Sequence, residues 1–88
     1  MISPRQVRMA RAGLGWTLAE LARRGHVNPN TLSRYEAGRD VLSGTVRKME
    51  GVLKEAGVEF IDEPDKEGVS LPRDAASVSP PAPPPKKV

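Results

Sequence analysis

The sequence lacks cysteine and has few aromatic residues. Without cysteine, a disulfide framework and a thiol-ligated metal site are both excluded. The 88 residues include three aromatic side chains, Trp16, Tyr35 and Phe60. A chain of this length forms one small domain, and about 60 residues is near the lower limit for a self-sufficient core. Because there is little aromatic bulk to bury, we expect marginal stability or dimerisation.

Long hydrophobic runs are also missing. No apolar stretch approaches the roughly 18 residues of a membrane span, and the N-terminal segment "MISPRQVRMARAG" has no signal-peptide core. We therefore expect a cytoplasmic protein without membrane association. The single histidine, the lack of cysteine and the absence of a spaced nucleophile–base or carboxylate pair argue against an enzyme. We expect neither a metal nor a cofactor.

Positive charge is concentrated in the first two thirds of the chain. Residues 1–61 hold ten basic and six acidic side chains (net +4), whereas residues 62–88 hold four basic and five acidic ones (net −1). Most of the basic residues are arginine, which forms bidentate bonds with phosphate and guanine. This excess favours a nucleic-acid partner, and a basic surface without a partner is the alternative.

Three segments share one helix-start pattern, in which an apolar residue precedes a capping residue and another follows it four positions later. The pattern predicts three short helices, over residues 3–12, 17–24 and 28–37. Their cap residues are Ser3, Thr17 and Asn28. Gln6 and Glu20 complete capping boxes in the first two segments. Trp16 stands directly before the second cap, so we expect it in the core rather than stacked on a base.

The predicted helix ends agree with these starts. Glycines stand where left-handed helix ends are expected, at Gly13, Gly25 and Gly38. A fourth helix is predicted over residues 43–56, with Gly57 after it and an apolar face formed by Val46, Met49, Leu53 and Ala56. All four helices are too short to be stable alone, so they must pack on one another.

The sequence pattern changes after Gly57. The β-prone runs "VEFI" and "GVSL" predict a hairpin that pairs residues 58–61 with about 69–71. An isolated hairpin is only marginally stable, so this one must pack on the helices or pair with a second copy. From Pro72 onward, six of the nine prolines predict a disordered tail with polyproline-II character. A solubilising tail and a PxxP ligand are both compatible with that composition.

The second and third predicted helices are joined by "RGHV", a turn of the length that a helix-turn-helix uses. Leu32 and Tyr35, three positions apart, would attach the third helix to the core. The side chains left for its outer face are Asn30, Thr31, Ser33 and Arg34. Asparagine pairs with adenine, arginine with guanine, and serine or threonine with several groups. Asn28 and Pro29 open this helix, whose N-terminal N–H groups and dipole suit a phosphate.

The run from "GLGWTLAELA" through "TLSRYEAG" to "AGVEFI" resembles the Xre / Cro–cI repressor family of helix-turn-helix proteins. The resemblance covers about residues 3–61 and implies a dimeric bacterial or phage regulator that binds operator DNA through residues 28–37. It assigns base or backbone contacts to Pro29, Asn30, Thr31, Ser33 and Arg34. It also pairs Arg11 with Glu36 across the first and third helices. Arg39 is a phosphate candidate, because the loop after the third helix commonly lies near the DNA backbone.

Two positions depart from the family pattern. Leu18 stands where the family commonly has glutamine, which removes one DNA contact and shifts the contacts near Thr17. His26 replaces the usual glycine of the turn, and a left-handed conformation is uncommon for histidine. Arg23 and Arg24 can be read equally as phosphate contacts or as a solvated helix face.

These features predict an all-α, four-helix domain over residues 1–57, a β-hairpin and dimerisation element over 58–71, and a disordered tail over 72–88. The predicted function is that of a sequence-specific transcriptional regulator, a repressor that binds double-stranded DNA as a homodimer. Dimerisation through the fourth helix, at Val52 or Leu53, is the competing arrangement. The alternatives in function are a protein-interaction module, such as an antitoxin or anti-activator with a protein partner, and a non-specific nucleic-acid binder. The polar third helix and the basic excess favour DNA.

Overall fold

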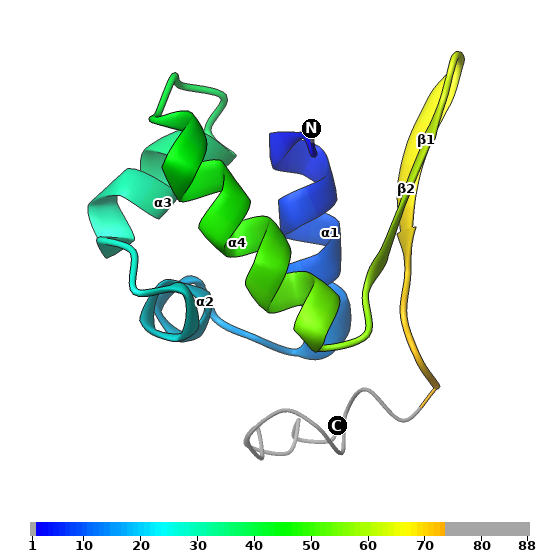
Figure 1. Cartoon of the computed structure of the whole chain (residues 1–88), viewed down its shortest axis with the longest axis horizontal. Coiled ribbons are helices and arrows are strands. Elements are labelled where there is room, and N and C mark those ends of the chain that lie inside the picture. Colours follow the sequence, from blue (N-terminus) through cyan, green and yellow to red (C-terminus); the bar gives the residue numbers. More distant parts are fainter. Residues whose placement is uncertain (1, 74–88) are drawn as a thin grey trace, which may run out of the picture.

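A computed structural model describes residues 2–73, which form four helices and a two-stranded antiparallel hairpin (Figure 1). The elements are α1 (Pro4–Leu14), α2 (Leu18–Gly25), α3 (Pro29–Glu36), α4 (Ser43–Glu55), β1 (Glu59–Glu63) and β2 (Lys66–Ser70). The predicted four-helix fold with a short C-terminal hairpin is confirmed. The predicted disordered tail falls almost entirely outside the described residues. No helix within residues 2–73 is long and apolar enough to cross a membrane.

The helices begin where the capping pattern predicts. Ser3 and Gln6 form a complete capping box, in which the Ser3 hydroxyl accepts from the Gln6 amide at 3.2 Å and Gln6 Oε1 accepts from the Ser3 amide at 3.0 Å. Thr17 Oγ1 accepts from the Glu20 amide at 3.0 Å. The second box is only half formed, because two arginines of α2 hold the Glu20 carboxylate. Asn28 Oδ1 caps α3 by accepting from the amide of Asn30 at 2.8 Å.

Two of the three predicted glycine helix ends are wrong. Helix α1 continues through Gly13 to a left-handed Gly15, and α2 includes Gly25 and ends at a left-handed His26. Gly13 serves close packing instead, because a Cβ atom there would lie 2.1 Å from Leu71 Cδ1. The predicted left-handed Gly38 is confirmed, with φ of 91°.

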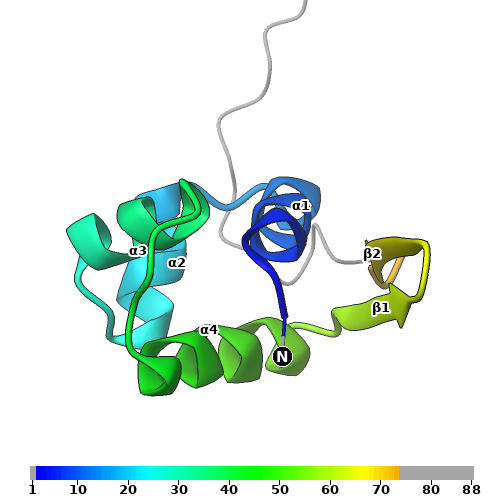
Figure 2. The same ribbon diagram turned by 90° about the horizontal axis from the view of Figure 1, so that it is seen from above.

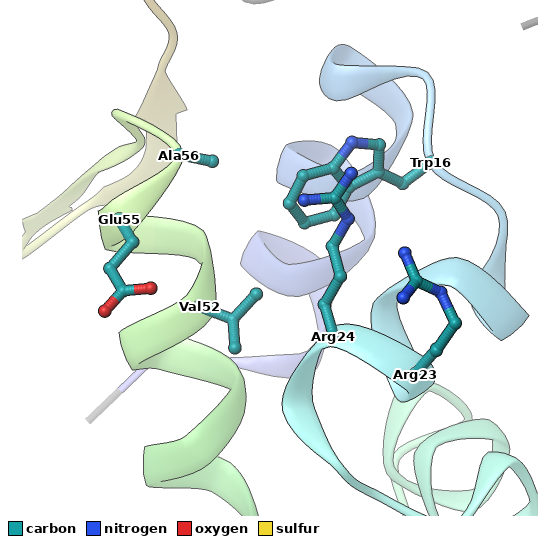
Figure 3. A pocket seen from close by; sticks show the side chains of 6 residues that line it. All are labelled: Trp16, Arg23, Arg24, Val52, Glu55 and Ala56. Carbon is teal, nitrogen blue, oxygen red and sulfur yellow. The ribbon is translucent and has the colours of Figure 1, made fainter. Parts of the chain in front are cut away.

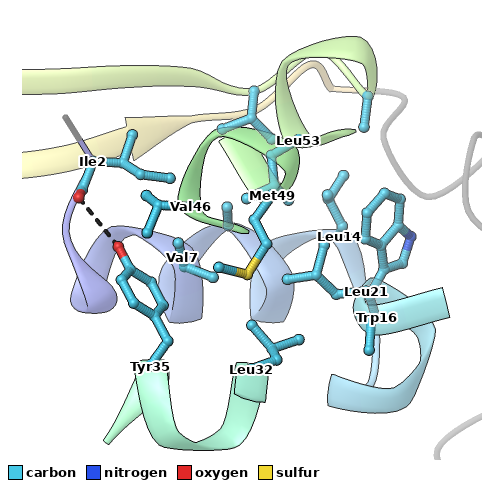
Figure 4. Close-up of a cluster of buried hydrophobic side chains, with 14 residues drawn as sticks. Ile2, Val7, Leu14, Trp16, Leu21, Leu32, Tyr35, Val46, Met49 and Leu53 are labelled. Atoms are coloured by element: carbon cyan, nitrogen blue, oxygen red, sulfur yellow. Dashed lines mark hydrogen bonds between the residues drawn. The ribbon is translucent and has the colours of Figure 1, made fainter. Parts of the chain in front are cut away.

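The helices enclose one hydrophobic core (Figure 4). Its largest fully buried side chains are Val7, Leu14, Leu21, Leu32, Met49 and Leu53. The predicted apolar face of α4 is confirmed, since Val46, Met49, Leu53 and Ala56 are all buried. Trp16 lies in this core as predicted, and the Tyr35 hydroxyl donates to the carbonyl of Ile2 at 3.1 Å.

The hairpin packs on α1, on the side of that helix away from α3 (Figures 1 and 2). Its strands are longer than predicted, with Phe60 opposite Val69 and a two-residue turn at Pro64 and Asp65. Gln6 of α1 donates from Nε2 to the carbonyl of Ile61 at 2.9 Å and to that of Gly68 at 3.0 Å. These bonds explain how a two-stranded sheet is held, because a buried amide from the helix binds both strands at once.

Candidate nucleic-acid interface

Helices α2 and α3 form a helix-turn-helix. The turn consists of residues 26–28, and the left-handed His26 (φ of 55°) reverses the chain direction at the end of α2. The amide of Val27 then donates to the Ala22 carbonyl at 2.9 Å, which closes the end of α2. The two helices pack directly on each other. Their relative orientation is therefore set by local hydrogen bonds and by the shared core.

Helix α3 has one buried and one exposed face. Leu32, Tyr35 and Glu36 are buried, at 0 %, 6 % and 6 % exposure. The side chains on the outer side are polar or basic apart from Pro29: Asn28, Asn30, Ser33 and Arg34 are exposed and Thr31 is partly exposed. The structure thus brings together on one helix most of the residues for which DNA contacts are predicted. Their contacts with DNA stay a prediction.

A partly buried ion pair holds α3 against α1. Arg11 Nε donates to Glu36 Oε2 and Arg11 Nη2 donates to Glu36 Oε1, each at 2.9 Å. Arg11 Nη1 also donates to the Trp16 carbonyl at 3.2 Å, and Arg8 donates to the backbone carbonyl of Glu36. Because four hydrogen bonds involve these groups, the exposed face of α3 is presented at a fixed angle.

The N-terminus of α3 presents fewer free donors than the sequence suggests. Pro29 has no amide hydrogen, and the Asn30 amide is already used by the Asn28 cap. The positive end of the helix dipole and the side-chain amide of Asn28 remain to attract a phosphate. At the start of α2, Thr17 is exposed, whereas Leu18 packs partly against the core. The Leu18 side chain thus contributes to packing where the family commonly has a polar contact.

The loop between α3 and α4 lies beside the exposed face of α3. A shallow pocket there is lined by Thr31, Arg34, Asp40, Val41, Leu42 and Thr45. Leu42 is 80 % exposed and caps α4 without a side-chain hydrogen bond. Arg39 is exposed at the beginning of this loop. The surface next to the outer face of α3 therefore combines arginine with an uncovered aliphatic side chain.

Arg23 and Arg24 are occupied by other groups. Glu20 Oε2 accepts from Arg23 Nη2 and from Arg24 Nε, each at 2.6 Å. The hydrogen bond from Arg23 is the main reason that the pKa of Glu20 lies below its usual value. The guanidinium of Arg24 also lies over the Trp16 ring, 4.2 Å from its centroid (Figure 3). These contacts favour a structural role over the predicted alternative of phosphate binding.

Four cations on α3, the following loop and the first half of α4 have no such partner. Within residues 2–73, no ion pair involves Arg34, Arg39, Arg47 or Lys48. All four are exposed, on α3, the following loop or the first half of α4. Sequence reasoning missed Arg47 and Lys48. The sequence could have indicated them, because they lie between Val46 and Met49 of the predicted apolar face of α4. In a helix, that spacing directs the two intervening side chains away from the core.

The Helix-turn-helix family profile matches residues 7–60, more than half of the chain. The chain belongs to the Xre / Cro–cI helix-turn-helix family. It is a DNA-binding helix-turn-helix regulator. The match runs from α1 into β1 and so includes the α2–turn–α3 unit and the whole of α4. No curated protein matches the sequence.

Proposed function

We propose that this helix-turn-helix regulator recognises a specific double-stranded DNA sequence by placing α3 in the major groove, and that it represses transcription by occupying its operator. The observation that most supports this proposal is the exposed polar face of α3, which the Arg11–Glu36 pair holds at a fixed angle. A helix with polar side chains outward and its apolar side chains in the core fits the groove of DNA better than an apolar protein partner.

The proposed base contacts come from the middle of α3. Arg34 is exposed and has no ion-pair partner within residues 2–73, so its guanidinium can form a bidentate contact with guanine. The exposed Asn30 side chain can pair with adenine, and Thr31 and Ser33 can bond several base edges. Because each of these side chains projects from one short helix, a single copy reads only a few base pairs.

The proposed phosphate contacts flank these bases. Thr17 at the start of α2, Asn28 and Pro29 at the start of α3, and Arg39 after α3 are all exposed. Contacts of this kind position the protein without reading sequence. They also make binding weaken as the salt concentration rises.

We further propose that the protein acts in the cytoplasm as a homodimer formed through the hairpin. Two reading helices about 34 Å apart would supply the specificity that one helix lacks. Ile61 is 39 % exposed and lies opposite Gly68, which offers no side chain to cover it. In the competing arrangement, the dimer forms through α4 at Val52 or Leu53. Leu53 cannot contribute to that interface, since it is fully buried within the protomer. Sedimentation of the intact chain and of Ile61→Lys tests this point, and an unchanged dimer in the variant would exclude the hairpin.

The experiment that tests the proposed function is selection of bound duplexes from a random DNA pool at physiological salt. The proposal predicts enrichment of one motif, palindromic if the dimer is correct. Retention of DNA without any enriched motif would identify a non-specific binder instead. An Arg34→Ala protein run in parallel shows whether the enriched positions depend on α3.

A further inference from the structure

We propose that Arg47 and Lys48 of α4 form an additional contact with the DNA backbone, outside the α2–turn–α3 unit. The proposal rests on the proposed DNA-binding function and adds a second element to its interface. It concerns a groove between the turn and α4, in which the guanidinium of the lining residue Arg24 is already bound by Glu20.

The groove is formed where α2 and its turn lie against α4. Arg24, Gly25 and His26 line one wall, and the α4 residues Arg47, Lys48, Gly51, Val52 and Glu55 line the other. His26 stands two residues before Asn28, the cap of α3, so the turn connects this wall of the groove to the α3 N-terminus. Gly51 has no side chain, and no atom lies within 4 Å of a Cβ built there, so this wall of the groove is open.

The direction of Arg47 and Lys48 is fixed by their neighbours on α4. Val46 and Met49 are buried at 3 % and 0 % exposure, which turns the two cations outward. Neither cation forms an ion pair within residues 2–73, whereas Lys54 of the same helix is bound by Glu50 at 3.0 Å. Two adjacent like charges repel each other, and an external anion would relieve that repulsion.

The charge distribution identifies DNA as the occupant. Residues 2–57 hold ten basic and five acidic side chains, and residues 58–71 hold one basic and five acidic ones. The acidic hairpin lies on the side of α1 away from α3 (Figure 2), and the basic excess belongs to the helical part of the chain. DNA carries one negative charge per about 1.7 Å of its axis, so neighbouring phosphates can serve two adjacent cations.

The test compares the intact protein with the double variant Arg47→Gln/Lys48→Gln on the same duplex over a range of salt concentrations. Each lost phosphate contact reduces the steepness of log affinity against log salt by about 0.9. The slope of the double variant should therefore be shallower by about 1.8. Its order of preference among duplexes should not change, because phosphate contacts carry no sequence information. The charge-preserving Arg47→Lys/Lys48→Arg protein should keep the original slope.

The matched control is Lys54→Gln, which removes one charge from α4 outside the groove and should leave the slope unchanged. An unchanged slope in the Arg47→Gln/Lys48→Gln protein would overturn the proposal, as would a changed base preference. A shallower slope in the charge-preserving protein would also overturn the proposal, because the change would then come from packing and not from charge. If the intact protein shows no salt-dependent binding to any duplex, the proposed function itself fails.

Discussion

Arg11 and Glu36 meet through two parallel hydrogen bonds, from Nε and Nη2 of the guanidinium to the two carboxylate oxygens, both 2.9 Å long. Glu36 is 6 % exposed, and the Arg11 side chain is 22 % exposed. The pair joins α1 to the last turn of the helix that we propose reads DNA. Its disruption should therefore affect both the stability of the domain and the angle of α3.

We predict that Glu36→Ala destabilises the fold by about 3–5 kcal/mol, because Arg11 is left partly buried without its partner. Chemical denaturation of the two single variants and the double variant with Arg11→Ala gives the coupling energy. The Glu50–Lys54 pair along α4 is the control, because its lysine is 59 % exposed, with an expected coupling of about 0.5 kcal/mol or less. Coupling between Arg11 and Glu36 as small as that of the control would refute the prediction.

The second prediction concerns base reading by Arg34. Arg34→Ala should cost about 1–3 kcal/mol on the selected duplex and relax the preference at one base pair. Arg23→Ala is the control, because Arg23 is exposed but bound by Glu20 on α2. Equal losses on all duplexes would assign Arg34 to phosphate, and unchanged binding would remove it from the interface.

Substitution by alanine should change the stability in opposite directions at Gly51, within α4, and at Gly57, just after it. Gly51→Ala should stabilise the protein by about 0.5–1 kcal/mol, since alanine is the better helix former and nothing lies within 4 Å of the new Cβ. Gly57→Ala should destabilise it by about 1–3 kcal/mol, because φ is +96° and the Cβ would lie 2.8 Å from Pro72 Cγ. Thermal or chemical unfolding of both variants checks the pair, and changes of the same sign would contradict the structure.

The fourth prediction is a loss of stability at alkaline pH that depends on Tyr35. Burial raises the pKa of the Tyr35 hydroxyl, and the nearby carboxylates of Glu50 and Glu67 add to the shift. A raised folded-state pKa means that the stabilisation is complete below the unfolded value of about 10 and is lost as pH rises through the folded value. Phenolate absorbance reports this residue directly, because it is the only tyrosine in the chain.

Tyr35→Phe isolates that contribution. At neutral pH the variant should lose about 1 kcal/mol, the usual contribution of a hydrogen bond such as that from the hydroxyl to the Ile2 carbonyl. Above pH ~10 the stability difference from the intact protein should shrink, since phenylalanine does not ionise. A constant difference across that range would show that Tyr35 titrates as it does in the unfolded chain.

The helix starts could be read from the sequence because capping is local. Ser3, Thr17 and Asn28 each accept a hydrogen bond from an amide two or three residues away, so a short pattern contains the whole interaction. The predicted helix ends at Gly13 and Gly25 were wrong for the opposite reason. Gly13 packs against Leu71, which is 58 positions away, and a glycine in close packing looks in sequence like one needed for a left-handed turn.

The candidate site was also only partly predictable. The polar face of α3 follows from helical period, since Leu32 and Tyr35 define the buried side. The second role of Gln6 could not be foreseen, because its bonds to Ile61 and Gly68 cross more than 50 positions of sequence. Nor does sequence show which cations lack ion-pair partners, and this is what distinguishes Arg47 from Arg24.

The most direct test of sequence-specific DNA binding is the ratio of two dissociation constants at physiological salt, one for the selected duplex and one for a scrambled duplex of the same length and composition. Specific regulators bind their sites about 10³–10⁷ times more tightly than other DNA, so we predict a ratio of at least about 10³. Arg34→Ala should reduce that ratio. Equal dissociation constants for the two duplexes would contradict the proposed function.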